Sequence, residues 1–467
     1  MARQDGPSRI GRRAALIGGL GGVAAAADAG AQSGQGQQRP RAAPGTAGLP
    51  PIVFVHGNMD TAALWHTTMW RFESNGYPRN LLHAIDFPYP TARTDDSRPQ
   101  PFRSSTTDQR DELAAFVKRV LADTRRRKAA LVGSSRGGNP IRAFLRNGGA
   151  DSVSHAVLCG ATNHGVVVSD TVLKGSEFNG AAPFLRQLNA GPVETVPGVA
   201  FLTLRSDKLD KWAQPDGQFL GMPGKPTGIS YDAPELKGAT NVVLPGLDHR
   251  EVAFDKLAFQ RMYEFIVGRP AAATFIAPEP EPVLNGKVTG VAEGGVYTNL
   301  PVRDATVEIW EVDPRTGARR TAAPAHRKAT GADGLWGPFR ARKDWCLEFV
   351  VAVSGSPVTH IYRSPFLRSS DVIHLRPALY AKDEEKAGAV VVMSRPRGYF
   401  GHGRDKFSLD GKVPPGINEG VPGTSTGRLT FEPAPPRTVV AVFNIETIAT
   451  RTWPVKDNRI VVAEFHN

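Results

Sequence analysis

Between residues 50 and 267 the chain alternates short apolar, β-branched runs with stretches of helical spacing, and this alternation constrains the fold more than any other feature. Runs such as PIVFVHG, KAALVGSS and VAFLTLRS are almost continuously apolar, as expected for strands buried on both faces of a parallel sheet. The stretch from Asp108 to Thr124 instead repeats Leu, Phe and Val at helical spacing. We therefore predict a doubly wound α/β sheet, which binds its ligands at the carboxyl ends of the strands.

Helical periodicity disappears after this part of the chain. Short β-rich runs replace it, separated by Gly, Pro and Asp turns: KVTGV, ATVEIWEV, CLEFVVAV, HIYRSPF, VIHLRP, AVVVMS, RLTFEP, TVVAVFNI and RIVVAEF. This pattern predicts a separate all-β sandwich or barrel region over 283–467, organised as one or two small domains. The alternating Pro and Glu residues within 271–282 predict a stiff linker between this region and an α/β domain at 49–270.

The N-terminal residues are typical of a targeting segment. Arg12 and Arg13 form a twin-arginine pair, a Gly/Ala-rich apolar stretch follows, and small residues at 29–31 offer a cleavage site before Gln32. The apolar stretch is too short for a stable membrane anchor. We predict a twin-arginine-like export signal at 1–31, with a Sec-type signal as the alternative, and a polar linker at 32–48. The mature protein is then expected to be secreted or periplasmic.

Composition excludes several classes of protein. The formal charge of +12 lies partly in the first 41 residues and is otherwise scattered, without a zinc-finger, basic-zipper or RNA-binding pattern, so we expect no nucleic-acid partner. The 2 cysteines are too few for a cysteine-based metal site, and each lies in an apolar run typical of a buried thiol. We expect neither a metal ion nor a cofactor.

A G-x-S-x-G motif, Gly133-Ser134-Ser135-Arg136-Gly137, lies between the strand AALV and the helix PIRAFL. The motif needs this strand–turn–helix setting, because the turn is too tight for side chains two residues before and after the serine. Such a turn holds the Ser135 hydroxyl above the sheet, near a helix N-terminus that favours negative charge. We predict Ser135 as a nucleophile; the alternative is a strand end without chemistry.

A serine hydroxyl needs a base to take its proton. We predict His249, which lies after the late strand NVVLPG and before the closing helix, with His164 on another strand-end loop as the alternative. The acid should follow the strand VAFLTLRS, where Asp207 and Asp210 both qualify. We favour Asp210, because an aspartate five residues before the proline is the commoner placement on this loop. The acid would orient the imidazole and stabilise its protonated form.

The transition state of acyl transfer carries an oxyanion that needs preorganised donors. We predict the backbone N–H groups of Asn58, after the first strand, and of Arg136, at the head of the helix that follows the nucleophile. The crossover between 160 and 199 also carries apolar residues at helical spacing, which form either a lid or acyl-pocket wall, or ordinary helix core: Phe178, Phe184, Leu185 and Leu188.

Several phrases together resemble exported class 2-type lipases and esterases of the α/β-hydrolase superfamily: PIVFVHGN, WRFESNGYP, VGSSRGGN, SDKLDKWAQP, PGLDHREV and YEFIVGRPAAATFIAP. With IYRSPFLRSSD and RIVVAEF, the likeness to archaeal and bacterial lipases with a C-terminal β-domain covers most of 49–467. The resemblance implies an α/β-hydrolase fold, ester hydrolysis and a β-domain that contacts lipid. The loop SDKLDKWAQP is also similar to the acid loop of fungal lipase B, which supports Asp210. The archaeal relatives carry their acid earlier, where this chain has Cys159, so we expect the acid to come from the later loop.

We therefore expect a serine ester hydrolase that acts on acylglycerols or other apolar esters through a Ser-His-Asp triad and an acyl-enzyme. An extracellular polyester depolymerase with the same triad is one alternative. A non-catalytic lipid- or carbohydrate-binding protein on a hydrolase scaffold is another. For the last, four aromatic residues offer either a sugar platform or ordinary core packing: Trp310, Trp336, Trp345 and Tyr362.

Overall fold

The computed structural model describes residues 48–417 and 419–466. The predicted export signal at 1–31 and all but the last residue of the predicted linker at 32–48 lie outside the described residues. The described residues all belong to one compact unit by their contacts. Among the described residues, no helix combines the length and the apolar composition that crossing a membrane requires.

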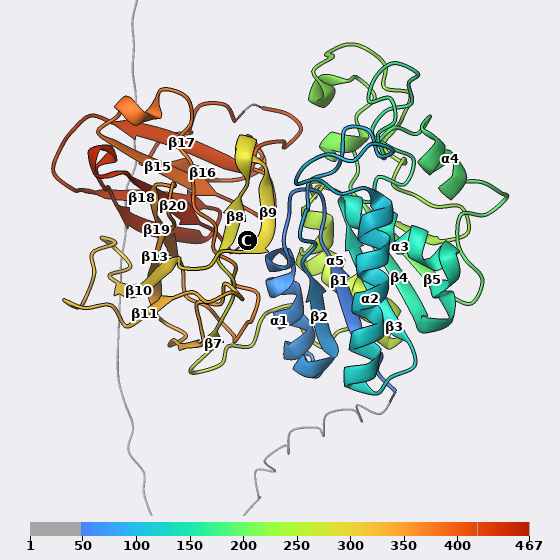
Figure 1. Cartoon of the computed structure of the whole chain (residues 1–467), viewed down its shortest axis with the longest axis horizontal. Helices are drawn as coiled ribbons and strands as arrows, with labels where there is room; N and C mark the ends of the chain where they lie inside the picture. The colour runs from blue at the N-terminus through green and yellow to red at the C-terminus, as the bar shows by residue number, and fades with distance from the viewer. Residues whose placement is uncertain (1–47, 418, 467) are drawn as a thin grey trace, which may run out of the picture. The chain divides into compact units, whose positions relative to one another are not determined.

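The first part of the described chain forms a six-stranded sheet of β1 (Ile52–Val55), β2 (Leu82–Ile85), β3 (Ala129–Ser134), β4 (Val153–Cys159), β5 (Ala200–Arg205) and β6 (Thr240–Val243). The strands are parallel and run in the order β2-β1-β3-β4-β5-β6, of which β1 to β5 are labelled in Figure 1. The chain passes from β1 to β2 on one side and returns to β3 on the other, so the topological switch point lies between β1 and β3. Ligands of such sheets bind at the carboxyl ends of the strands beside this point.

Helices α1 (His66–Ser74) and α5 (Lys256–Val267) cover one face of this sheet, and α2 (Thr106–Thr124) and α3 (Gly138–Phe144) cover the other. The short helix α4 (Pro183–Leu188) belongs to the crossover between β4 and β5. Successive residues of a strand point to opposite faces. Ile52 and Phe54 of β1 therefore pack in one core with α1 and α5, whereas Val53 and Val55 pack in another with α2 and α3. This arrangement confirms the predicted doubly wound α/β fold.

The remaining described chain is built from β7 (Val283–Leu284), β8 (Thr289–Val291), β9 (Tyr297–Pro301), β10 (Thr306–Val312), β11 (His326–Ala329), β12 (Phe339–Arg340), β13 (Cys346–Ala352), β14 (Val358–Arg363), β15 (Ala389–Ser394), β16 (Phe407–Leu409), β17 (Thr426–Phe431), β18 (Thr438–Phe443), β19 (Glu446–Arg451) and β20 (Arg459–Glu464). A seven-stranded sheet, β11-β10-β13-β14-β20-β15-β17, packs against a three-stranded sheet, β16-β18-β19. On β20, Val461 and Ala463 face the smaller sheet, and Ile460 and Val462 face the opposite core. The predicted all-β region is confirmed as stacked sheets.

The prediction of a strand at VIHLRP is wrong. Residues 372–377 form no regular strand: they make an isolated bridge between Leu375 and Val288, and the amide of Ile373 donates to the carbonyl of Asn285 at 3.0 Å. Ile373 and Leu375 are nevertheless fully buried in the core on that side of the large sheet, so the apolar pattern records burial and not regular pairing. Trp336 and Tyr362 are also buried, which gives core packing and not a sugar platform.

The predicted Pro/Glu linker lies against α1. The Asn75 side-chain amide donates to the carbonyl of Ala273 at 2.8 Å, and the Ser74 hydroxyl accepts from the amide of Ala277 at 2.9 Å. Arg79 forms an ion pair of 2.6 Å with Glu279. These contacts hold the segment in place along the helix, although its composition alone predicts only an extended, stiff chain.

We predict that Phe72→Ala lowers the free energy of unfolding by about 3–5 kcal/mol, because it removes a fully buried ring and leaves a cavity. Phe72 makes edge contacts with the rings of Phe54, Tyr77 and Phe259. Urea unfolding measures the effect. The matched control is Phe275→Ala, because Phe275 is 69% exposed and its loss should change stability by less than about 0.5 kcal/mol. Equal losses in the two variants would contradict this description of the core.

Candidate active site

The turn after β3 holds Ser135 in a strained conformation. Its φ of +52° lies in the left-handed region that non-glycine residues seldom adopt, and a short 3-10 turn, Ser135–Gly137, leads into α3. A Cβ on Gly133 would lie 2.9 Å from the carbonyl oxygen of Gly137. A Cβ on Gly137 would lie 2.7 Å from the carbonyl oxygens of Val55 and His56. Both positions therefore require glycine, for the reason that the motif predicts.

The loops after β5 and β6 bring two further predicted residues to Ser135. Nε2 of His249 lies 2.8 Å from Oγ of Ser135, so the hydroxyl can donate to the ring. Nδ1 of His249 lies 2.8 Å from Oδ1 of Asp210. The angle of this second contact departs from that of a hydrogen bond, and the ring must tilt for its N–H to point at the carboxylate. Such contacts commonly tighten when substrate binds.

Asp210 is held rigidly by its own loop. Its Oδ1 also accepts from the amide of Trp212 at 2.8 Å, which caps a short 3-10 turn. The side-chain amide of Gln214 donates to the carbonyls of Lys208 and Asp210 at 2.8 and 2.7 Å. The carboxylate is therefore fixed in direction before any substrate arrives.

The two alternative residues lie elsewhere. Asp207 accepts from the amides of Leu209 and Gly246, both at 3.1 Å, so its carboxylate closes the loops after β5 and β6. His164 binds the carboxylate of Glu194 at 2.9 Å and the carbonyl of Ala233 at 2.8 Å. The structure thus brings together Ser135, His249 and Asp210, and gives Asp207 and His164 loop-bracing contacts.

The two predicted oxyanion donors flank the nucleophile. The chain after β1 passes so close to Ser135 that a Cβ on Gly57 would lie 3.1 Å from the Cβ of Ser135. Asn58 follows directly and lines the cavity, while its side-chain oxygen accepts from the amide of Ala92 at 2.8 Å. Arg136 follows Ser135 in the chain. The use of these two N–H groups as donors stays a prediction.

The side chain of Arg136 has a role that the sequence does not indicate. Its guanidinium is fully buried and pairs with the buried carboxylate of Glu177 at 2.5 Å. It also donates to the carbonyls of Pro90 and Ser104 at 3.1 and 2.7 Å. These contacts anchor the turn that carries Ser135, because a buried ion pair with satisfied hydrogen bonds resists displacement. No local pattern links Arg136 to Glu177, so only the structure reveals the pair.

A cavity of about 970 Å³ opens over Ser135 and His249. One side comes from the α/β part, with Phe178, Phe219 and Leu220. The other side comes from the large β-sheet, where Ile361, Val462 and Val392 lie in register on the neighbouring strands β14, β20 and β15. Phe178 lines the cavity, which fits the interpretation as a pocket wall. Leu185 and Leu188 of the same crossover are buried in the protein interior, which fits the interpretation as helix core.

Lys211 is a cavity residue that sequence analysis missed. It follows Asp210, and its ammonium lies 4.7 and 4.4 Å from the ring centroids of Trp212 and Tyr399. Nζ donates to the carbonyl of Gly423 at 2.9 Å, which ties the acid loop to the β region. Burial lowers the pKa of Lys211 to about 8, with the charge of Arg250 acting in the same direction.

The described residues hold no cluster of three or more His, Cys, Asp or Glu side chains that is arranged to bind a metal ion. Cys159 and Cys346 are both free, and burial raises the pKa of the Cys159 thiol, which suits an inert core residue. The chemistry available at the cavity is that of a hydroxyl next to an imidazole, with a carboxylate on the far side of the ring. Such an order suits proton removal from the hydroxyl as it attacks a carbonyl carbon.

Two family models match the chain over these two parts. The model of the alpha/beta hydrolase family matches residues 52–269, and the model of the lipase C-terminal domain matches residues 282–379. Residues 52–269 thus belong to the alpha/beta hydrolase family, and residues 282–379 form a lipase C-terminal domain. The family resemblance drawn from the sequence phrases is thereby confirmed. No curated protein matches the sequence of this chain.

Solved structures similar to this chain include two lipases and a phospholipase. Aspergillus fumigatus lipase B shares 15% identity with a TM-score of 0.36, over 49% of this chain and 54% of its own chain, so this chain spans about half its length. A mature Bacillus licheniformis lipase shares 21% identity with a TM-score of 0.36, over 49% of this chain and 94% of its own chain. A Legionella pneumophila phospholipase shares 11% identity with a TM-score of 0.34, over 90% of this chain and 93% of its own chain.

We predict that Gly137→Ala distorts the turn at Ser135 and lowers stability by about 1–3 kcal/mol or more, because its Cβ would press on backbone oxygens that cannot move aside. Thermal unfolding measures the change. Gly331→Ala is the control, since a Cβ there meets only the Asp333 side chain at an ordinary 3.4 Å. A Gly137→Ala variant as stable as this control would show that the turn has room for a side chain.

Proposed function

We propose that the protein is a serine carboxylic-ester hydrolase, a lipase or esterase, with Ser135 as nucleophile, His249 as general base and Asp210 as the acid. One observation carries the proposal: the hydroxyl, the imidazole and the carboxylate lie in sequence at 2.8 and 2.8 Å, at the rim of a cavity beside the switch point of the sheet. Membership of the α/β hydrolases and the lipase C-terminal domain supports ester hydrolysis as the reaction.

In the proposed acylation step, Oγ of Ser135 attacks the ester carbonyl while Nε2 of His249 takes the hydroxyl proton. The protonated ring is stabilised by the charge of Asp210 and then gives its proton to the leaving alcohol. In deacylation, His249 takes a proton from the water that attacks the acyl-enzyme, and then returns this proton to Oγ of Ser135 as the carboxylic acid leaves. Each step is completed by the same three side chains, so no cofactor is required.

The proposed oxyanion donors are the backbone N–H groups of Asn58 and Arg136. The close approach of Gly57 to Ser135 supports Asn58, and the buried pair between Arg136 and Glu177 supports Arg136, because it fixes the backbone that carries the second N–H. Each donor would contribute a factor on the order of 10²–10³ to turnover. Main-chain donors on rigid elements lose little to reorganisation as the charge develops.

We propose apolar esters, acylglycerols among them, as the substrates. The wall formed by Ile361, Val392 and Val462 is an apolar strip across three strands and suits an alkyl chain. The lipase C-terminal domain supplies Ile361 of this wall, which agrees with a lipid ester. The proposed export at 1–31 would give the enzyme access to substrates outside the cell.

We predict that Ser135→Ala abolishes hydrolysis of emulsified triacylglycerol, with a loss on the order of 10⁶ in kcat, because no nucleophile remains. The second measurement is labelling by a fluorophosphonate probe, which should modify the wild-type protein at Ser135 and leave the variant unmodified. Ser134→Ala, next in the chain, is the matched control and should retain both properties. Hydrolysis that survives in Ser135→Ala would end the proposed mechanism.

We predict that Asp210→Asn lowers kcat on a soluble chromogenic ester by a factor on the order of 10⁴, because the amide can no longer orient and stabilise the protonated ring. Asp207→Asn should leave kcat within about threefold of the wild type, because Asp207 serves the loop backbone and not His249. The reverse ranking of these two variants would assign the acid to Asp207.

A further inference from the structure

The loop 246–251, which carries His249 and is called the base loop below, is held by the carboxylates of Asp248 and Glu251. Oδ1 of Asp248 accepts from the amides of Arg250 and Glu251 at 2.8 and 3.0 Å. Oε2 of Glu251 accepts in return from the amide of Asp248 at 2.7 Å. His249 lies between these residues, so the backbone that carries its ring is closed from both sides by side-chain hydrogen bonds. The position of the ring therefore depends on where the two carboxylates lie.

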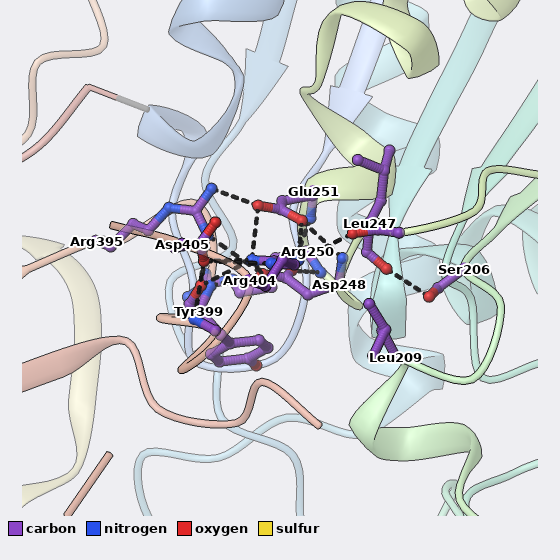
Figure 2. A network of polar contacts seen from close by, with 12 residues as sticks. Ser206, Leu209, Leu247, Asp248, Arg250, Glu251, Arg395, Tyr399, Arg404 and Asp405 are labelled. Atoms are coloured by element: carbon purple, nitrogen blue, oxygen red, sulfur yellow. Dashed lines mark hydrogen bonds and ion pairs between the residues drawn. The ribbon is translucent and has the colours of Figure 1, made fainter. Parts of the chain in front are cut away.

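The same two carboxylates also accept hydrogen bonds from the C-terminal β region (Figure 2). Oδ2 of Asp248 accepts from the backbone amide of Tyr399 at 2.7 Å and from the guanidinium of Arg395 at 3.3 Å. Oε1 of Glu251 accepts from Arg395 at 2.6 Å, and Oε2 accepts from Arg404 at 2.7 Å. Arg404 also donates to the carbonyl of Gly246 at 3.1 Å, on the strand side of the base loop.

The β region holds its two arginines firmly. Arg395 directly follows β15 and donates to the carbonyl of Tyr399, which closes the segment 395–399 on itself. Asp405 accepts from Arg404 at 2.8 Å and from the amide of Gly401 at 2.8 Å. The β region thus holds both guanidinium groups in place beside the base loop. A planar guanidinium is suited to such bidentate contacts.

Burial makes these contacts obligatory. The side chain of Asp248 is fully buried, and that of Glu251 is 9% exposed. Burial and the neighbouring charge of Asp248 raise the pKa of Glu251, and the charges of Arg395 and Arg404 oppose that rise. Without the arginines, two adjacent carboxylates would be buried together, and the base loop would have to shift to hydrate them or to take up a proton.

The base loop is also held by the α/β part, where Arg250 pairs with Asp60. The Ser206 hydroxyl donates to the carbonyl of Leu247, and Gly160, with φ of +55°, lies where a Cβ would be 2.8 Å from the carbonyl oxygen of His249. Both contacts come from the ends of β5 and β4, on the side of the α/β sheet. The outward side of the loop is held by the network in Figure 2.

We infer that the segment 395–405 of the C-terminal region is a positioning element for the base, in which Arg395 and Arg404 set the place of His249 through Asp248 and Glu251. This inference rests on the proposed function, because it gives the C-terminal region a part in the chemical step besides its part in the cavity wall. Arg395 and Arg404 do not touch the reacting atoms and are positioning residues.

A purely structural role, in which ion pairs only join the two parts of the chain, makes a different prediction. Arg368 offers the comparison, because it also links the β region to the α/β part, with ion pairs to Glu73 of α1 at 2.9 Å and to Glu279 at 3.1 Å. Its side chain is 16% exposed, and that of Arg404 is 22% exposed. The two arginines thus match in type, burial and span, and differ in whether they reach the base loop.

The experiment compares Arg404→Gln, Arg404→Lys and Arg368→Gln in the full-length protein, on a soluble chromogenic ester. We expect Arg404→Gln to lose roughly 10- to 100-fold in kcat with KM changed less than about threefold, because a small displacement of a catalytic group acts mainly on the chemical step. Arg404→Lys keeps the charge and should recover part of the loss. Arg368→Gln should keep kcat, whatever its effect on the melting temperature.

Each outcome decides the inference. If Arg404→Gln keeps kcat, or if Arg368→Gln loses as much kcat as Arg404→Gln, the network only joins the two parts and the inference is overturned. If Arg404→Gln does not fold, the fluorophosphonate labelling rate of folded Arg404→Lys decides instead, and a rate equal to that of the wild type overturns the inference. An inactive, unlabelled wild-type protein would overturn the proposed function first, and this inference with it.

Discussion

A backbone turn with no room for side chains at its flanks holds the whole site together. Ser135 adopts a positive φ. Gly137 lies so close to the end of β1 that a side chain there would clash with two backbone carbonyl oxygens. The strain is sustained because β1 and β3 are neighbouring strands buried on both faces. The same packing sets the distance between the nucleophile and the loop after β1, and it gives the later loops a fixed point to approach.

The C-terminal region completes the site from the opposite side through one strand. β15 carries Val392 in the cavity wall, ends at Ser394 on the same wall and continues as Arg395 in the network beside the base loop. The surface that would contact an acyl chain and the residues that brace the base loop are therefore consecutive parts of one element. A shift of this strand would change both at once, which couples the shape of the cavity to the geometry of the proposed chemistry.

Sequence patterns predict the α/β fold well because a buried parallel strand is continuously apolar and a covering helix repeats every three to four residues. They also select Ser135, His249 and Asp210 as candidates, because glycine requirements and chain order are local or ordered along the chain. They fail at VIHLRP, where burial with only isolated pairing produces the same apolar pattern as a regular strand. The partners of Arg136, Lys211 and Asp248 could not be predicted, because each pair joins residues far apart whose proximity only folding creates.

The order of strands in the large sheet affects how the protein is made. β14 and β15 are not neighbours: β20 lies between them, pairs in parallel with both, and is synthesised last of the three. The ribosome must release residues 459–464 before these two strands can be joined, so the sheet cannot form progressively as the chain emerges. Until then the backbone edges of β14 and β15 that β20 will pair stay open to solvent, and such open edges favour aggregation of the nascent chain.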